Sequence, residues 1–392
     1  RTVRKGKMKG FVNCNVYIEG KGVQKCSVGF EDGKIAYIGN DLSGIEPLME
    51  LSEEQVVVPG FIDEHIHGAA GCDAMDGTTE ALSKVATAIA KEGTVGFLAT
   101  TMTQSPENIG RAMVAVKDYM AEDHPEGAAV LGLHLEGPFI SKKHVGAQPL
   151  EYVAEPSVET FRKYNEMSGN HIKIVSMAPE VEGADELISY LSANGIVASI
   201  GHTDAGYKDA VCAVAHGAKN VTHTYNAQKG LHHREIGTVG SALLLDELNC
   251  ELICDTIHVS VPAIKLVVKN KPHNKLTLIT DAMRAKHMPD GESELGGQLV
   301  IVKNGEARLV DGTLAGSVLK MNNAIKNVVT LCGVSFTDAV DFATINPATT
   351  LGVADRLGSI KEGKDASVAV LNRNTFEVAL TIRDGKVVYE NA

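Results

Sequence analysis

Six side chains that could bind a metal ion or move a proton each stand at the end of an apolar run of the sequence. Five offer imidazole nitrogens or a carboxylate, which suit a zinc-like divalent ion, and the sixth offers a further carboxylate that suits a general base. The five candidate metal ligands are His65, His67, Glu136, His202 and His223, and the candidate base is Asp281. These residue types predict a metal-dependent hydrolase.

The runs before these residues have the length and composition of strands, and strand geometry can bring the six side chains together. Residues i and i+2 of a strand point to the same face, so His65 and His67 share a face. Residues far apart in sequence meet if each closes a parallel strand of one barrel, because the carboxyl ends of such strands form the active-site rim. The alternative for His65 and His67 is a pair of histidines hydrogen-bonded inside the barrel.

Three neighbouring polar residues have other expected roles. Asp63 shares a face with His65 by alternation and is expected to orient the ligands, whereas Glu64 points the other way and is expected to be structural. His134 lies two residues before Glu136 and one layer deeper in the barrel, where a hydrogen-bonded core histidine is expected.

Strand-like runs alternate with helical ones from residue 56 to about residue 354, and eight strand candidates there favour a TIM-type barrel over a doubly wound sheet. The two end segments, rich in short strands and Asp-Gly turns, are each too small to fold alone. We therefore expect an α/β protein: a (β/α)8 barrel over residues 56–354, and a small β-sandwich domain formed by the N-terminal segment 1–55 and the C-terminal segment 355–392. The Gly-rich residues 286–314 are expected as an insertion after the eighth strand. The strand candidates are VVVPGFID, GFLAT, AVLGLHLE, IKIVSMAPE, IVASIGH, NVTH, ELICD and LTLITD.

Composition narrows the function classes. A formal net charge of −12 argues against nucleic acid or an anionic membrane as the main partner. No run approaches the ~20 apolar residues of a membrane span, and the basic start RTVRKGKMKG lacks the apolar core of a signal peptide. Seven cysteines without a Cys-x-x-Cys pair are typical of reduced thiols. These features predict a cytoplasmic protein whose partner is a small molecule.

Other hydrolytic chemistries lack their motifs, since the chain has no Gly-x-Ser-x-Gly elbow, no His-Glu-x-x-His helix and no P-loop. Several segments instead resemble the amidohydrolase superfamily and, within it, the N-acetylglucosamine-6-phosphate deacetylase family. His-Leu-Glu-Gly-Pro-Phe is the most specific of them. The matching segments span nearly the whole chain: PGFIDEHIHG, HLEGPFISKKHVGAQ, IGHTDA, THTYNAQ, TDAM, LAGSVLKMNNA, INPATTLG and GSIKEGKDASVAVL.

The resemblance implies roles for the candidate metal-binding residues. The residues that would hold the principal ion are Glu136, His202 and His223. Asp281 matches the family's general base and acid. Members of the family differ at the positions of His65 and His67, and because both histidines are present here, a second ion is available, with Glu136 as the bridge. The implied metal is Zn²⁺, as one or two ions, with Fe²⁺ as the alternative.

The resemblance also implies how a sugar phosphate is bound. Arg234 and His258 would reach across the interface of a homodimer to the phosphate in the neighbouring subunit, so that the subunits share their active sites. Arg suits a phosphate because its planar fork bonds two oxygens, although on its own Arg234 is typical of a solvated surface residue. Gln148 stands, with Ala147, where some members carry a substrate-contacting His. The other implied substrate-binding residues are Ala147, Asn226, Ala227, Leu314, Ala315 and Gly316.

The implied reaction is hydrolysis of the acetamide of N-acetyl-D-glucosamine 6-phosphate to D-glucosamine 6-phosphate and acetate, in amino-sugar catabolism. The alternatives are the galactosamine isomer as substrate, another amidohydrolase reaction, and a catalytically silent sugar-phosphate-binding homologue.

Overall fold

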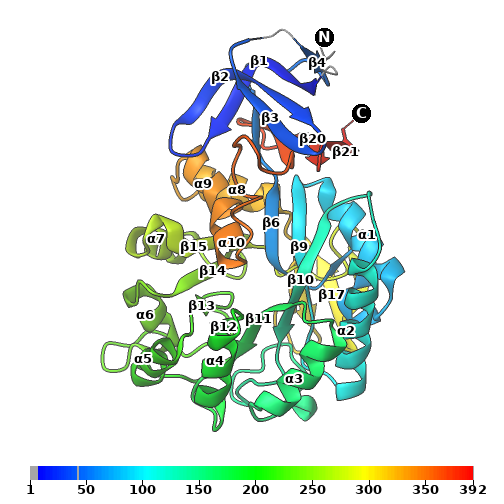
Figure 1. Cartoon of the computed structure of the whole chain (residues 1–392). Coiled ribbons are helices and arrows are strands. Elements are labelled where there is room, and N and C mark those ends of the chain that lie inside the picture. The colour runs from blue at the N-terminus through cyan, green and yellow to red at the C-terminus, as the bar shows by residue number, and fades with distance from the viewer. Residues whose placement is uncertain (1–7, 42–43, 392) are drawn as a thin grey trace.

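The computed structural model describes residues 8–41 and 44–391, which form a barrel and a smaller mixed sheet (Figure 1). Most of the basic start of the chain, in which no signal peptide is expected, lies outside the described residues. The smaller sheet unites the two ends of the chain, blue and red in Figure 1, and the barrel contains the residues between them.

Eight parallel strands form the barrel in the order of the sequence. The first and last strands meet at a seam, where the backbone N–H of Asp281 donates to the carbonyl of His65 at 2.8 Å. The predicted TIM-type barrel is therefore confirmed. Its strands are β6 (Phe61–Ile66), β9 (Thr94–Thr100), β10 (Ala129–Glu136), β11 (Ile172–Met177), β12 (Val197–Ile200), β13 (Asn220–Val221), β14 (Asn249–Ile253) and β15 (Leu276–Ile279).

Helices cover the outside of the barrel because each has an apolar face (Figure 1). In α1 (Thr79–Ala90), Leu82, Val85 and Ile89 are buried at a spacing of three and four residues, and the N-cap Thr78 accepts a backbone hydrogen bond. No helix in the described part of the chain is long and apolar enough to cross a membrane. The other helices are α2 (Pro106–Met120), α3 (Val158–Met167), α4 (Ala184–Ala193), α5 (Tyr207–His216), α6 (Gly237–Leu244), α7 (Val261–Asn270), α8 (Met321–Thr330), α9 (Phe336–Phe342) and α10 (Ile345–Thr350), with 3₁₀ turns η1 (Ala74–Asp76), η2 (Leu150–Tyr152) and η3 (His273–Lys275).

The two ends of the chain pair into one mixed sheet, which confirms their predicted association. β19 (Val368–Asn372) lies antiparallel to β5 (Gln55–Pro59), and β5 lies parallel to β1 (Met8–Ile18). An Asp-Gly turn closes one hairpin, with φ of 51° at Asp32 and 74° at Gly33, the left-handed pair that a two-residue hairpin turn requires. The remaining strands of this sheet are β2 (Gly22–Glu31), β3 (Lys34–Gly39), β4 (Ile45–Pro47), β20 (Val378–Arg383) and β21 (Lys386–Glu390).

The run VVVPGFID, expected as one barrel strand, is divided at Gly60 between the two sheets. β5 ends at Pro59 and belongs to the smaller sheet, whereas β6 begins at Phe61 and opens the barrel. A Cβ atom at Gly60 would lie 2.2 Å from the side chain of Val95, so the close packing here requires glycine. The chain thus passes directly from one sheet into the other.

The predicted insertion after the eighth strand is a three-stranded antiparallel sheet. Its strands are β16 (Gly291–Leu295), β17 (Gln298–Lys303) and β18 (Glu306–Leu309), and a further small hairpin pairs β7 (Gly68–Ala69) with β8 (Cys72–Asp73). Leu295 at the end of β16, and Leu314 after β18, line the cavity at the mouth of the barrel. The insertion therefore forms part of one wall of the candidate site.

Candidate active site

Three of the six predicted residues occupy the same unusual position after a barrel strand. His202, His223 and Asp281 each come two residues after the end of β12, β13 and β15, with φ of 48°, 27° and 48°. Residues other than glycine adopt this left-handed conformation rarely and at an energetic cost. All three line the cavity, so the sharp turns position these side chains at the mouth of the barrel.

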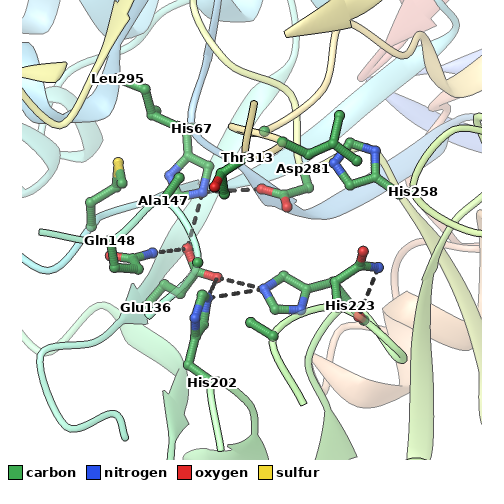
Figure 2. A pocket seen from close by; sticks show the side chains of 16 residues that line it. His67, Glu136, Ala147, Gln148, His202, His223, His258, Asp281, Leu295 and Thr313 are labelled. Atoms are coloured by element: carbon green, nitrogen blue, oxygen red, sulfur yellow. Dashed lines mark hydrogen bonds and ion pairs between the residues drawn. The ribbon is translucent and has the colours of Figure 1, made fainter. Parts of the chain in front are cut away.

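Glu136, the last residue of β10, lies at the centre of the cluster (Figure 2). Its Oε1 atom is 3.1 Å from Nε2 of His202 and 3.0 Å from Nε2 of His223. Its Oε2 atom is 3.1 Å from Nε2 of His67 and accepts a hydrogen bond from the side-chain amide of Gln148 at 2.9 Å. Each of the two carboxylate oxygens thus faces at least one imidazole nitrogen, so Glu136 could contribute to more than one metal site.

The donor atoms of Glu136, His202 and His223 fit a divalent ion. The Nε2 atoms of the two histidines are 3.1 Å apart, and all three side chains are buried. Ligand atoms around a tetrahedral zinc ion lie about 3.3 Å from one another when each is about 2.0–2.1 Å from the metal, so the observed spacing is close to that of a metal site. Two imidazole nitrogens and a carboxylate oxygen are also a donor set that zinc binds.

A second group of donors lies on the other side of Glu136. His65, His67 and Asp281 each place a potential ligand atom within 4.8 Å of the others. The Nε2 atom of His65 is buried without a hydrogen-bond partner, although it lies 3.4 Å from Oε1 of Glu136 and 3.4 Å from Oδ1 of Asp281. A buried nitrogen that faces two carboxylates without a hydrogen bond is positioned as a metal ligand would be.

The carboxylates create a strongly negative potential at the histidines. Burial lowers the pKa of His67, but hydrogen bonds to Asp281 and Glu136 outweigh burial and raise this pKa to about 10. Burial raises the pKa of Asp281, but His65 and His67 outweigh it and lower this pKa to about 2. Each shift favours the charged form, and the potential that retains a proton on an imidazole also favours a metal cation.

The sequence gives little indication of two contacts in the cluster, those that Glu251 and Gln148 form. Glu251 is fully buried in β14, and its Oε2 atom accepts a hydrogen bond from Nδ1 of His65 at 2.9 Å. The available signal was a carboxylate inside the apolar run NCELIC, because a buried carboxylate needs partners. Gln148 stands at a position that varies in the resembling family, but nothing in the sequence indicates its contact with Glu136.

Asp63 and His134, two further polar residues in the barrel strands, form hydrogen bonds to neighbouring strands and strand ends. Asp63 accepts hydrogen bonds from the hydroxyl and the backbone N–H of Thr280 at 2.5 and 3.3 Å, and from the backbone N–H of His65 at 3.3 Å. It therefore holds the backbone beside the base and at the candidate ligand His65, although it contacts no imidazole ring. His134 is a core histidine, as predicted: Nδ1 bonds to the carbonyl of Glu64 at 3.0 Å and Nε2 to the hydroxyl of Ser176 at 2.6 Å. Burial lowers the pKa of His134 to about 4, which keeps this ring neutral.

The cluster opens into a cavity of about 190 Å³ that contains most of the predicted substrate-binding residues. Two of these residues do not line it. Ala315 is buried beside the cavity, and Arg234 is exposed, with its guanidinium 2.8 Å from Nε2 of His233. The predicted residues that do line it are Ala147, Asn226, Ala227, His258, Leu314 and Gly316. Within one chain, Arg234 is therefore separate from the site.

His258 is oriented by a carboxylate of its own loop. Its Nδ1 atom lies 2.6 Å from Oδ2 of Asp255, and its side chain is almost fully buried. Because Nδ1 is engaged, Nε2 is the ring atom that remains for a ligand in the cavity. His258 was expected to reach the phosphate of the neighbouring subunit, but it lines the cavity of its own chain.

Comparison with known proteins supplies the family. Residues 56–388 match the model of the amidohydrolase family. The chain belongs to the amidohydrolase family. Over 379 residues, this amidohydrolase is 42% identical to the N-acetylglucosamine-6-phosphate deacetylase of Bacillus subtilis, a match that covers 95% of each chain. It is 36% identical over 345 residues to the N-acetylgalactosamine-6-phosphate deacetylase of Escherichia coli O157:H7, covering 87% of this chain and 91% of that protein.

A solved amidohydrolase structure has the same architecture. The N-acetylglucosamine-6-phosphate deacetylase of Thermotoga maritima superposes with a TM-score of 0.88 at 35% identity, covering 97% of this chain and 100% of that one. The resemblance seen in the sequence motifs is thus confirmed over nearly the whole chain.

Proposed function

We propose that this amidohydrolase removes the acetyl group of N-acetyl-D-glucosamine 6-phosphate and releases D-glucosamine 6-phosphate and acetate. The observation that carries the proposal is the position of Asp281, whose carboxylate lines the same cavity as Glu136, His202 and His223. A carboxylate beside a metal-binding cluster can serve as the base that amide hydrolysis needs. The relatives from Bacillus subtilis and Thermotoga maritima support the choice of substrate.

The cluster would hold the metal in two adjoining places. Glu136, His202 and His223 would bind the principal ion, and His65 and His67 would bind a second one on the other side of Glu136. A divalent ion held there supplies Lewis acidity, which acidifies water and offsets negative charge on a carbonyl oxygen. We propose Zn²⁺, in one or two copies, with Fe²⁺ as the alternative, because imidazole and carboxylate ligands suit both.

Asp281 would perform both proton transfers. Its carboxylate takes a proton from the water whose oxygen bonds to the acetamide carbon, and it then gives a proton to the amide nitrogen. The C–N bond breaks as the protonated amine leaves, and the acetyl group becomes acetate. The hydrogen bond from the Asp281 N–H to the His65 carbonyl, at 2.8 Å, holds the base at the barrel seam during these steps.

The sugar phosphate would occupy the remainder of the cavity. Asn226, Ala227 and the turn at 314–316 would contact the sugar, and His258 would present Nε2 to the phosphate. Arg234 is not positioned to contact a phosphate in this cavity, because it is exposed and separate from the cavity of its own chain. We propose that it serves the partner's site in a homodimer.

The cysteines, all free thiols, support a cytoplasmic location for this enzyme.

The proposal is tested by acetate release from three substrates: N-acetylglucosamine 6-phosphate, its galactosamine epimer, and unphosphorylated N-acetylglucosamine. We expect the highest kcat/KM for the first. Loss of the phosphate removes charge-assisted hydrogen bonds of about 1.5–3 kcal/mol each, so the unphosphorylated sugar should be poorer by at least ~10-fold.

The relative from Escherichia coli makes the galactosamine epimer the second candidate. A higher kcat/KM on that epimer would move the proposal to it. Release of no acetate from either phosphorylated sugar would contradict the proposed activity and favour a silent sugar-phosphate-binding protein.

A further inference from the structure

We propose that Glu251 is a positioning residue that holds both halves of the metal-binding cluster at once. The inference rests on the proposed metal-dependent function. Glu251 lies in β14, is fully buried and is no part of the cavity lining. One oxygen, Oε2, accepts hydrogen bonds from two separate residues of the cluster: Nδ1 of His65 at 2.9 Å and the backbone N–H of His223 at 3.1 Å.

The contact with His65 selects which ring nitrogen can bind an ion. A carboxylate at Nδ1 keeps the proton on that atom, so the lone pair of a neutral ring resides on Nε2. Nε2 of His65 is the buried atom without a hydrogen-bond partner that faces Glu136 and Asp281. Glu251 thereby prepares His65 to act as a ligand of the second site.

The contact with His223 acts through the backbone. Nδ1 of the His223 ring has no hydrogen-bond partner. This imidazole therefore lacks the hydrogen bond from its other ring nitrogen that usually orients a metal-binding histidine. The backbone at His223 has a strained φ of 27°, and its N–H is held by Glu251. Fixing that N–H fixes the turn from which the ring reaches Glu136, and with it a ligand of the principal site.

A series of side-chain hydrogen bonds ends at Glu251, and each step in it donates toward that residue. Position 251 must therefore offer acceptor oxygens only, as a carboxylate does. The Thr277 hydroxyl donates to Oδ1 of Asn249 at 3.1 Å, the Asn249 amide donates to Oδ1 of Asn220 at 2.6 Å, and the Asn220 amide donates to Oε1 of Glu251 at 3.1 Å. Both oxygens of Glu251 therefore receive donors. A glutamine there would place its NH₂ group against one of them, because it has only one acceptor oxygen.

The chain contains a matched control in Glu64. This carboxylate is also fully buried, lies next to His65 in sequence, and has neither oxygen in a hydrogen bond. Gln has nearly the same size and shape as this side chain, and no hydrogen bond of the Glu64 side chain is lost by the substitution. Glu64→Gln changes the same atoms as Glu251→Gln without touching the contacts to His65 and His223.

The test measures zinc affinity and stoichiometry of the whole protein by chelator competition, together with the visible absorption spectrum after cobalt substitution. We expect Glu251→Gln to weaken zinc binding by about 10–100-fold, the usual scale for a lost outer partner of a metal ligand, and to change the cobalt spectrum. Glu64→Gln should stay within about twofold of the wild type. A purely structural role for Glu251 would lower the thermal midpoint and leave the metal affinity and cobalt spectrum unchanged.

A second variant keeps the inference testable if Glu251→Gln does not fold. Asn220→Ala removes the donor to Oε1 of Glu251 and keeps the carboxylate, so it should weaken zinc binding in the same direction by a smaller factor. Wild-type zinc affinity in Glu251→Gln, or in Asn220→Ala where that is the variant that folds, would overturn this inference. An equal loss in Glu64→Gln would do the same. A wild-type protein that binds no divalent ion would instead contradict the proposed function itself.

Discussion

Oδ1 of Asp281 lies 3.1 Å from Nε2 of His67, which joins the candidate base to a candidate metal ligand across the seam of the barrel. The two residues come from opposite ends of the barrel sheet, since His67 follows β6 and Asp281 follows β15. Closure of the barrel is therefore what places the base at the metal-binding cluster.

Replacement of Asp281 tests proton transfer, and because Asp281 also belongs to the second group of donors, metal content is measured beside turnover. Asp281→Asn keeps the size of the side chain and removes the basic oxygen, so turnover should fall by at least ~100-fold, the usual scale for a lost acid–base group. Steady-state kinetics and metal analysis of the same preparation make the test. Near-normal kcat with unchanged metal content would assign the base to another residue.

The five ligands should not be equally important. Glu136→Gln, His202→Ala and His223→Ala remove ligands of the principal ion, and each should abolish activity and lower the metal content. His65→Ala and His67→Ala affect only the second group of donors, so they should retain part of the activity if one ion suffices. Metal content and kcat measured for all five variants establish the order. Loss of His202 or His223 without loss of activity would contradict the assignment.

Several parts of the site were predictable from the sequence for a physical reason. A polar residue that ends an apolar run at a strand terminus must lie at an edge of the sheet, and in a parallel barrel the carboxyl edges meet. His65, His67, Glu136 and Asp281 were found in this way, and the structure brings them together. Alternation also placed His134 one layer deeper, where it is a bonded core residue.

The other features of the site and the fold depend on contacts between residues far apart in the sequence, and such contacts produce no local sequence pattern. Glu251 lies within an apolar strand, and its partners His65 and His223 belong to two other strand ends. The division of VVVPGFID at Gly60 depends on the packing of Val95 against the backbone. The position of Arg234 outside the cavity of its own chain depends on the path of an exposed loop, and only the resemblance to the family, and no periodicity, indicates it.

Shared active sites in a homodimer predict complementation between two inactive variants. When Asp281→Asn and Arg234→Ala subunits are mixed and allowed to exchange, one site of each heterodimer has an intact base from one subunit and an intact Arg234 from its partner. Random pairing gives about a quarter of the wild-type sites, so activity should rise to about that fraction. Mixing Asp281→Asn with a variant that carries both substitutions is the control and should give no gain. Absence of any gain after confirmed exchange would place Arg234 in its own chain's function or in none.

The buried ion pair of Glu92 and Lys286 should contribute to the acid sensitivity of the fold. Glu92 accepts hydrogen bonds from Lys286 and His287 at 3.0 and 2.7 Å, and Glu92 and Lys286 are buried. Burial raises the pKa of Glu92, but Lys286 and His287 outweigh it and lower the pKa below 4.5. Stability from this carboxylate is therefore present above pH ~4.5 and is lost as pH falls through the lowered pKa.

Glu92→Gln should lower the free energy of unfolding at pH 7 by about 3 kcal/mol, because Lys286 is left buried without its counter-charge. The variant should also lose less stability than the wild type on acidification. Thermal midpoints at pH 7 and at a series of pH values below ~4.5 measure both effects. The exposed pair of Glu159 and Lys163 provides the control, since Glu159→Gln should change little. Equal midpoints for the Glu92 variant and the wild type at pH 7 would show that the pair is not stabilising.

The most direct test of the account is the metal dependence of acetate release from N-acetylglucosamine 6-phosphate. The purified protein is stripped with a chelator, assayed, and assayed again after stoichiometric Zn²⁺ or Fe²⁺ is restored, with metal content measured at each stage. We expect the stripped protein to be inactive and one of the two ions to restore turnover. Full turnover by protein shown to contain no metal would contradict the assignment of Glu136, His202 and His223 as the ligands of a catalytic ion.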